Sequence, residues 1–288
     1  MNSSRLEREE YWENEDDVVR GTNDDATISR MSAASLGYIE DPFVHFFVKR
    51  PVQRPPIINR GSYLRVMALT DIVQQFLQCS DISHKKQIVS LGAGFDTRYF
   101  LLKAGIIPVD SKTQFKYFEI DFPEMTAKKA FTIKRQNKLA SMLINPVELS
   151  SSDYALIGGD LREWSKIAER LTHHGFQADL PTLFISECVL IYLAPEESQS
   201  ILDWITANVQ NAMFLLYEQI LPDDTFGQVM LRNLKSRNIE LKGIHAYPTL
   251  EAQIQRFKQL NWGGALAVDI NTLHDRPSAQ NEIKRYAC

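Results

Sequence analysis

The sequence predicts an α/β protein with a mostly parallel sheet that helices cover on both faces. Stretches with helical apolar spacing alternate with five short runs rich in apolar residues: 87–91, 115–122, 154–157, 183–186 and 212–217. Strands that alternate with helices are joined by right-handed crossovers and therefore run parallel. Pro123 and Pro195 stand where the first turn of a helix tolerates proline, which supports two of these crossovers.

The N-terminal part of the chain predicts an acidic leader followed by a helical region. Residues 1–16 are rich in charge and lack the apolar core of a secretory signal, so we expect them to be disordered. Over residues 17–60 the pattern favours a helix that ends at Gly37, a short apolar helix after Pro42 and a rigid proline-rich connector. From about Asn59, apolar residues recur at three- and four-residue steps, which indicates a longer amphipathic helix.

The rest of the chain, residues 61–288, is predicted to form the α/β domain. Between its strands, the helix-compatible stretches are residues 97–103, 123–137, 162–172 and 195–208. After the fifth strand we expect helices around 226–238 and 250–260, and then a last strand at 265–270.

The composition excludes several classes of protein. A net charge of −4 and a pI of about 5.9 leave no global positive field, so we do not expect nucleic acid as a partner. No run approaches the roughly 18 consecutive apolar residues of a membrane-spanning helix, so a membrane is not expected either. The three cysteines match neither a disulfide framework nor a zinc pattern, and we expect no metal site. We expect a monomer in the cytoplasm or the nucleus.

The first strand leads into a glycine-containing loop, Gly92-Ala93-Gly94. In open parallel sheets ligands bind beyond the carboxyl ends of the strands, and glycines with free N–H groups at a helix start admit a ligand close to the backbone. A dinucleotide site favours a third Gly or Ala at position 97 and no anion nearby, whereas this chain has Asp96 and Thr97. The loop therefore favours a positively charged ligand, the alternative being a tight turn in which Asp96 caps the helix.

Three further strands end in acids, each with a plain alternative. Asp121 suits the two hydroxyls of a ribose, unless it only helps to begin the helix at Pro123. Asp160 followed by Leu161 suits an adenine edge, because the carboxylate takes the exocyclic amine and the next N–H reaches a ring nitrogen; otherwise Asp160 is a helix N-cap. Glu187 leaves a buried run, where a carboxylate is costly unless paired, so we expect a positively charged ligand beside it.

The order of the four acidic strand ends is more informative than any one of them. Taken together they match a ligand with an ammonium group, a sulfonium, a ribose and an adenine. The sequence therefore predicts S-adenosylmethionine as the cofactor rather than a dinucleotide.

With these residues in view, the sequence resembles the leucine carboxyl methyltransferase family over about residues 24–269. The resemblance is carried by the segments Asn59–Arg65, Val89–Arg98, Tyr117–Pro123, Gly159–Arg162 and Glu187–Tyr192, and it extends through Tyr217–Gln219 and Asp224–Gln228. It implies a Rossmann-like, S-adenosylmethionine-dependent enzyme that methylates the C-terminal leucine carboxylate of the protein phosphatase 2A catalytic subunit. In that case residues 61–288 are the methyltransferase domain, and the helices before it form a lid.

The resemblance also implies roles for single residues. Cofactor binding is implied for Arg30, Arg65, Gly92, Asp121, Asp160, Leu161 and Glu187. Of these, Gly92 and Glu187 hold the methionine end of the cofactor. Arg65 faces the carboxylate of the cofactor or of the substrate. Arg65 and Tyr192 are the two residues for which a catalytic role is implied. Tyr192 would line the leucine pocket; its alternative is a half-buried core tyrosine. For Arg30 the alternative is a solvated helix arginine.

The sequence departs from the family near its C-terminus. Relatives finish with a strand that inserts between the fifth and sixth strands of the sheet, whereas this chain ends at Cys288, so we expect that strand to be missing. One alternative function is therefore a catalytically weak or dead form that binds the phosphatase. A second is a nucleotide-dependent oxidoreductase, which Asp96 and Thr97 oppose.

The expected reaction is a direct in-line displacement at the sulfonium methyl. A peptide carboxyl has a pKa of about 3.3–3.7 and is already ionised at neutral pH, so the attack needs no general base. Alignment and water exclusion are what the protein would contribute.

Overall fold

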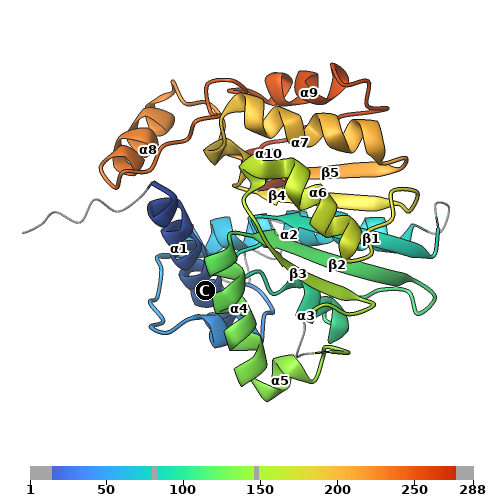
Figure 1. Ribbon diagram of the computed structural model, residues 1–288. Coiled ribbons are helices and arrows are strands. Elements are labelled where there is room, and N and C mark those ends of the chain that lie inside the picture. Colours follow the sequence, from blue (N-terminus) through green and yellow to red (C-terminus); the bar gives the residue numbers. More distant parts are fainter. Residues whose placement is uncertain (1–14, 80–82, 146–148, 277–288) are drawn as a thin grey trace, which may run out of the picture.

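A computed structural model describes residues 15–79, 83–145 and 149–276. Its centre is a five-stranded sheet in the order β3-β2-β1-β4-β5, and all four strand pairs are parallel (Figure 1). The strands are β1 (Lys85–Leu91), β2 (Gln114–Asp121), β3 (Tyr154–Gly158), β4 (Thr182–Glu187) and β5 (Ala212–Tyr217). The predicted Rossmann-like α/β fold is confirmed, and each of the five expected strands is present.

The sheet divides the apolar core into two layers. Ile88 on β1 lies level with Tyr117 and Leu183 on one face. The next residue, Val89, lies level with Phe118 and Phe184 on the other face. All of these side chains are buried, because successive residues of a strand point to opposite faces and both faces are covered.

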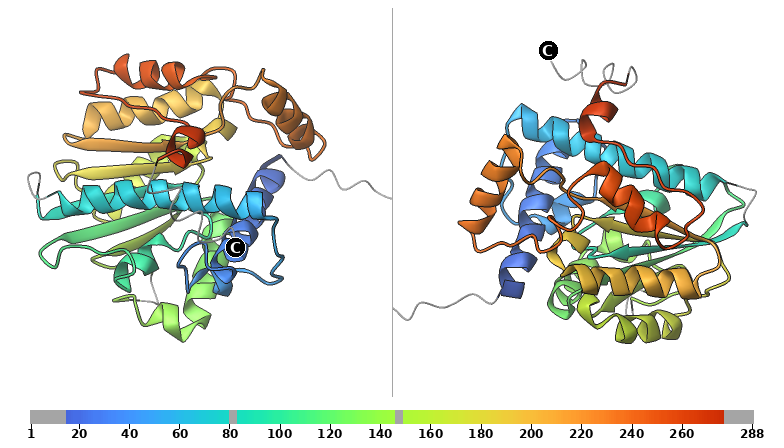
Figure 2. Two further views of the ribbon diagram at one scale, coloured as in Figure 1. Left: turned by 180° about the vertical axis from the view of Figure 1, so that it is seen from behind. Right: turned by 90° about the horizontal axis from the view of Figure 1, so that it is seen from above.

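Different helices cover the two faces. On the Ile88 face lie α2 (Pro56–Gln78), α3 (Arg98–Lys103) and the 3₁₀ turn η1 (Val44–Phe47), together with α4 (Pro123–Arg135) and α5 (Asn137–Ala140) at its edge. On the Val89 face lie α6 (Trp164–His173), after the turn η2 (Leu161–Glu163), and α7 (Pro195–Asn208), after the turn η3 (Leu190–Tyr192). Figure 1 is seen from the side of α6 and α7, and the view from behind in Figure 2 shows α2 across the opposite face.

The N-terminal region differs from the expected boundaries in two places. The first helix, α1, spans Glu15–Ser35, so it begins two residues inside the segment that we expected to be disordered; residues 1–14 lie outside the described residues. The helix expected from Asn59 begins at Pro56, because proline is well suited to a first helical turn. The expected boundary between 60 and 61 therefore falls inside α2, which is one continuous helix.

The C-terminal region contains the two expected helices and a third short one, but residues 264–269 are irregular where a sixth strand was expected. Here lie α8 (Thr225–Lys235), α9 (Leu250–Lys258) and α10 (Ile270–His274). The strand expected at 265–270 is wrong: Leu266 is 88% exposed, and Asp269 accepts a hydrogen bond from the Thr272 N–H and so begins α10. Within the described residues β5 is consequently the last strand, with one edge unpaired. None of the described helices is long and apolar enough to cross a membrane.

Candidate active site

A cavity of about 550 Å³ lies at the carboxyl ends of the strands. It is centred where the strand order reverses, between β1 and β4, which is the usual ligand position in such sheets. Because Leu91 pairs with Ile120 and Ser186, the next residues of these strands, Gly92, Asp121 and Glu187, end at one level. All eight predicted site residues line this cavity: Arg30, Arg65, Gly92, Asp121, Asp160, Leu161, Tyr192 and Glu187.

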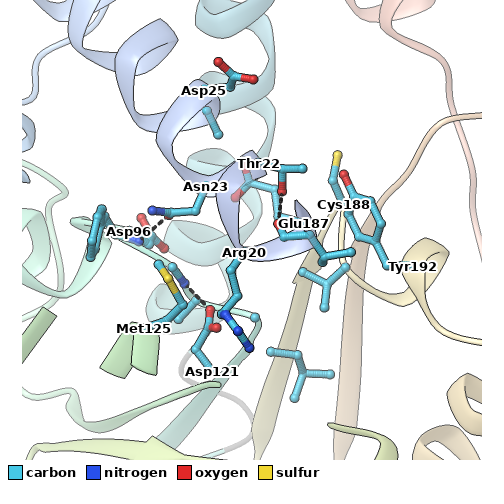
Figure 3. A pocket seen from close by; sticks show the side chains of 18 of the residues that line it. Arg20, Thr22, Asn23, Asp25, Asp96, Asp121, Met125, Glu187, Cys188 and Tyr192 are labelled. Atoms are coloured by element: carbon cyan, nitrogen blue, oxygen red, sulfur yellow. Dashed lines mark hydrogen bonds between the residues drawn. The ribbon is translucent and has the colours of Figure 1, made fainter. Parts of the chain in front are cut away.

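Helix α1 closes the cavity from the side opposite the sheet. Figure 3 shows Arg20 of α1 reaching toward Asp121, and Asn23 of α1 pointing toward the side of Asp96. The Asn23 side chain touches the glycine loop directly, since its Oδ1 accepts the Phe95 N–H at 2.9 Å. The first helix is therefore part of the cavity wall.

The backbone of the glycine loop is already satisfied by the protein. The N–H of Gly94 donates to Asp121 Oδ2 at 2.7 Å, that of Phe95 donates to Asn23, and that of Ala93 donates to the Ile120 carbonyl. We expected free N–H groups at the start of the following helix, whereas these three N–H groups of the preceding loop are occupied. A loop with its donors occupied is poorly suited to a pyrophosphate, which binds through such donors.

The glycine at position 92 is required by a close contact with Val189. Gly92 has φ +58°, a left-handed conformation that disfavours other residues. A Cβ at this position would lie 2.5 Å from a methyl carbon of Val189. The space above Gly92 is therefore filled in part by this valine, which is itself part of the cavity lining.

Glu187 is paired by two arginines of the chain. Arg65 Nε donates to Glu187 Oε1 at 2.5 Å, and an Arg98 guanidinium nitrogen donates to Oε2 at 2.9 Å. Burial opposes the charge, but Arg65 and Arg98 outweigh it and hold the pKa of Glu187 well below its usual range. The expectation that a ligand must supply the partner is therefore corrected: the carboxylate is ionised before any ligand arrives.

These residues belong to a row of six alternating charges, which we call the charge chain. Its members, in order of contact, are Asp41, Arg30, Asp96, Arg98, Glu187 and Arg65. Arg30 Nε lies 2.7 Å from Asp41, and another guanidinium nitrogen of Arg30 lies 3.2 Å from Asp96. The alternative that Arg30 is a solvated helix arginine is wrong, since its side chain is 13% exposed. The charge chain carries three positive and three negative groups, so it is neutral as a whole.

Asp121 and Asp160 differ in their surroundings. Asp121 Oδ2 and Oδ1 accept the N–H groups of Gly94 and Phe122, and burial raises the pKa of this carboxyl. Asp160 accepts the Arg162 N–H, as the N-cap reading expects, and its carboxylate also contacts the Arg162 guanidinium. Burial acts against its charge, but these hydrogen bonds prevail and the pKa of Asp160 is lowered.

Tyr192 and Leu161 each serve two environments. Tyr192 packs with Ile191 and Val18 in a small apolar cluster while it also lines the cavity, and burial raises its pKa. Leu161 packs with Trp164 in the layer beneath α6 and likewise lines the cavity. The position of Tyr192 therefore agrees with both interpretations, a core tyrosine and a pocket residue.

Asn23 and Arg98 are among the residues of this site that were missed from the sequence. Asn23 belongs to a polar stripe of α1, residues 20, 23, 27 and 30, whose three- and four-residue steps place them on one helix face. That spacing was available in the sequence and would have linked Asn23 to Arg30. Arg98 left no such signal, because its partner Glu187 lies 89 residues away.

Known proteins resemble this chain over most of its length. The family model described as "Leucine carboxyl methyltransferase" matches residues 19–206. "Leucine carboxyl methyltransferase 1 homolog" of Arabidopsis thaliana is 45% identical over 88% of this chain and 76% of its own length. "Leucine carboxyl methyltransferase 1" of Rattus norvegicus is 38% identical over 90% and 80%. "tRNA wybutosine-synthesizing protein 4" of Rattus norvegicus is 36% identical over 93% of this chain but only 40% of its own length.

Proposed function

Because the chain belongs to the leucine carboxyl methyltransferase family, we propose that it methylates the C-terminal leucine carboxylate of the protein phosphatase 2A catalytic subunit. As a member of this family it is an S-adenosylmethionine-dependent carboxyl methyltransferase; the phosphatase as substrate is our proposal. The observation that carries it is the convergence of Arg65, Asp121, Asp160 and Glu187 on one cavity at the switch point of the sheet.

The chemistry of the cavity suits S-adenosylmethionine. Its volume of about 550 Å³ lies within the range of small-molecule sites. Arg65 and Glu187 present opposite charges side by side, which is the complement of an amino acid zwitterion. When bound, this cofactor supplies an activated methyl group.

Each of the predicted site residues then has a defined role in the cavity. Glu187, which is held ionised, binds the ammonium of the methionine end, and Arg65 binds a carboxylate. Asp121 accepts from the ribose, while Asp160 and Leu161 bind the adenine edge. Arg30 keeps Asp96 and Asp41 paired, so the loop after β1 stays in place.

The protein substrate needs positioning rather than activation. Its terminal carboxylate is ionised at neutral pH, so no side chain of the cavity has to remove a proton. We assign Tyr192 to the wall that receives the leucine side chain, and α1 to the exclusion of water. Oriented reactants in a water-poor site account for much of a typical rate enhancement.

One of the two alternatives is less well supported. Membership of a methyltransferase family and the occupied N–H groups of the glycine loop both count against a nucleotide-dependent oxidoreductase. For the catalytically weak or dead phosphatase-binding form, the cavity supplies the same residues, and methyl transfer is what distinguishes it from an active enzyme.

The test is methyl transfer with labelled cofactor. We expect label on a phosphatase catalytic subunit that ends in leucine and none on the same protein with an amidated C-terminus. Arg65→Ala should abolish transfer while the fold survives, and Arg135→Ala, which removes an exposed arginine of α4, should leave it unchanged.

Two results would contradict the proposal. Transfer of the labelled methyl group to tRNA instead of to the phosphatase would indicate an activity like that named for the wybutosine-synthesis relative. Calorimetry that detects NAD binding and no S-adenosylmethionine binding would exclude the cofactor.

A further inference from the structure

Arg98 and Asp41 are the most deeply buried members of the charge chain, each with a side chain that is 1% exposed. Arg98 is the first residue of α3. The described residues that line the cavity include its two acidic partners, Asp96 and Glu187, but not Arg98 itself. The arginine therefore stands behind the cavity wall and touches the ligand space only through these two carboxylates.

The contacts of Arg98 fix both partners. One guanidinium nitrogen donates to Asp96 Oδ2 at 2.7 Å and the other to Glu187 Oε2 at 2.9 Å, while its backbone N–H donates to Asp96 Oδ1 at 3.1 Å. Asp96 thus has both oxygens bound by one residue. Glu187 has one oxygen bound by Arg98 and the other by Arg65. A planar guanidinium suits this bridging geometry, which a lysine cannot reproduce.

From this geometry we propose that Arg98 is a positioning residue for methyl transfer: it holds the Glu187 and Asp96 carboxylates in place at the cavity wall without contacting the ligands. The inference rests on the proposed function, in which Glu187 binds the methionine end of the cofactor. The inference adds Arg98 as a residue that affects cofactor binding indirectly, through Glu187.

The charges around Glu187 define what the loss of Arg98 would do. The groups that face this carboxylate are Arg30 from α1, Arg65 from α2, Arg98 from α3, the Cys188 thiol and the Tyr217 hydroxyl. Burial raises the pKa of Cys188 to about 12 and also raises that of Tyr217, so both stay neutral near pH 7. Without Arg98 the charge chain has three acids and two bases, and burial then favours protonation of a carboxyl.

The test is cofactor binding by calorimetry as a function of pH. We compare the intact chain with Arg98→Met, Arg98→Lys and a matched control, Lys86→Met. Lys86 is also a buried cation, but it binds the carbonyls of Phe76, Leu77 and Cys79 at the opposite end of the sheet.

The expected results separate positioning from folding. The intact chain and Lys86→Met should bind S-adenosylmethionine equally at all values between about pH 5 and 8, even though Lys86→Met unfolds more easily. Arg98→Lys should bind about tenfold more weakly with a flat profile, because it keeps the charge and loses the bridge. Arg98→Met should bind weakest and should lose further affinity as the pH falls, with KM rising for the cofactor and not for the protein substrate.

Several outcomes would overturn the inference. An affinity for Arg98→Met equal to that of the intact chain would do so. If Arg98→Met does not fold, Arg98→Lys decides: unchanged affinity, or failure of this variant to fold as well, reduces Arg98 to a structural residue. No binding by the intact chain would remove the proposed function itself, and this inference with it.

Discussion

The neighbouring strands β4 and β5 end in glutamates that the protein treats in opposite ways. Glu187, at the end of β4, is paired by Arg65 and Arg98, and its pKa lies well below the usual range. Glu218 directly follows β5, and among the described residues no basic side chain forms an ion pair with it. Burial raises the pKa of Glu218 to about 8, although the N–H groups of Val189 and its neighbours and the charge of Arg256 act against this.

The difference shows that burial alone does not decide the charge of a strand-end acid. Both carboxyls are removed from water, which disfavours the ionised form. Two paired guanidinium groups reverse that preference at Glu187, whereas Arg256, which forms no ion pair with Glu218, does not, and Glu218 stays largely protonated at neutral pH. Only Glu187 is therefore ready to bind a cationic group, and Glu218 acts as a neutral, buried polar residue.

The matched variants Glu187→Gln and Glu218→Gln should break this comparison most clearly. Glu187→Gln leaves Arg65 without its counter-charge and Arg98 with Asp96 alone, so we expect a loss of roughly 100-fold in cofactor affinity and about 3 kcal/mol in stability. Glu218→Gln should keep methyl transfer nearly intact, because glutamine resembles a protonated glutamate. Calorimetry and denaturant unfolding measure both effects, and equal losses in the two variants would refute the assigned charge states.

The stability of Glu218→Gln as a function of pH tests the charge state of Glu218 through a smaller effect. With a pKa of about 8 in the folded state and about 4.3 unfolded, Glu218 binds a proton in the folded chain that the unfolded chain has lost. Its contribution is therefore present below about pH 4.3 and is lost as the pH rises toward 8, by at most about 1.4 kcal/mol per pH unit. Relative to the intact chain, Glu218→Gln should gain stability between pH 5 and pH 8. A stability gap that stays constant over this range would contradict the raised pKa.

The smallest effect is expected at the rim of the cavity. Asp16 lies 2.7 Å from Arg162, which also holds Asp160 after β3, and these side chains are partly exposed. Asp16→Asn should cost no more than about 1 kcal/mol, because water screens such pairs, and the cost should shrink further in high salt. Unfolding at low and high salt provides the measurement. A loss of stability as large as that of Glu187→Gln would mean that the rim is as well shielded from water as the charge chain.

The sequence predicted the strands and their acidic ends because both are local features. Apolar runs mark β1 to β5, and the acids follow the runs directly. The strand expected at 265–270 failed because its apolar residues have no sheet face to cover, and because Asp269 begins a helix. Local pattern alone does not reveal whether an apolar run is buried.

The ion pairs and hydrogen bonds within the site could not be predicted from the sequence. Arg98 and Glu187 are separated by 89 residues, and Asn23 and Phe95 by 72. We expected a ligand beside Glu187 because a buried carboxylate needs a cation, and the chain itself provides two. The roles assigned to the eight site residues stay predictions, although the fold gathers all of them at one cavity.

The charge chain also constrains how this protein can evolve. Its six members come from helices, loops and one strand end, yet every neighbour in the order of contact carries the opposite sign. A single change of sign would leave a neighbour unmatched in a water-poor setting, and an exchange within one pair would set like charges against the next member. Among related sequences, Asp41, Arg30, Asp96 and Arg98 should therefore all keep their signs.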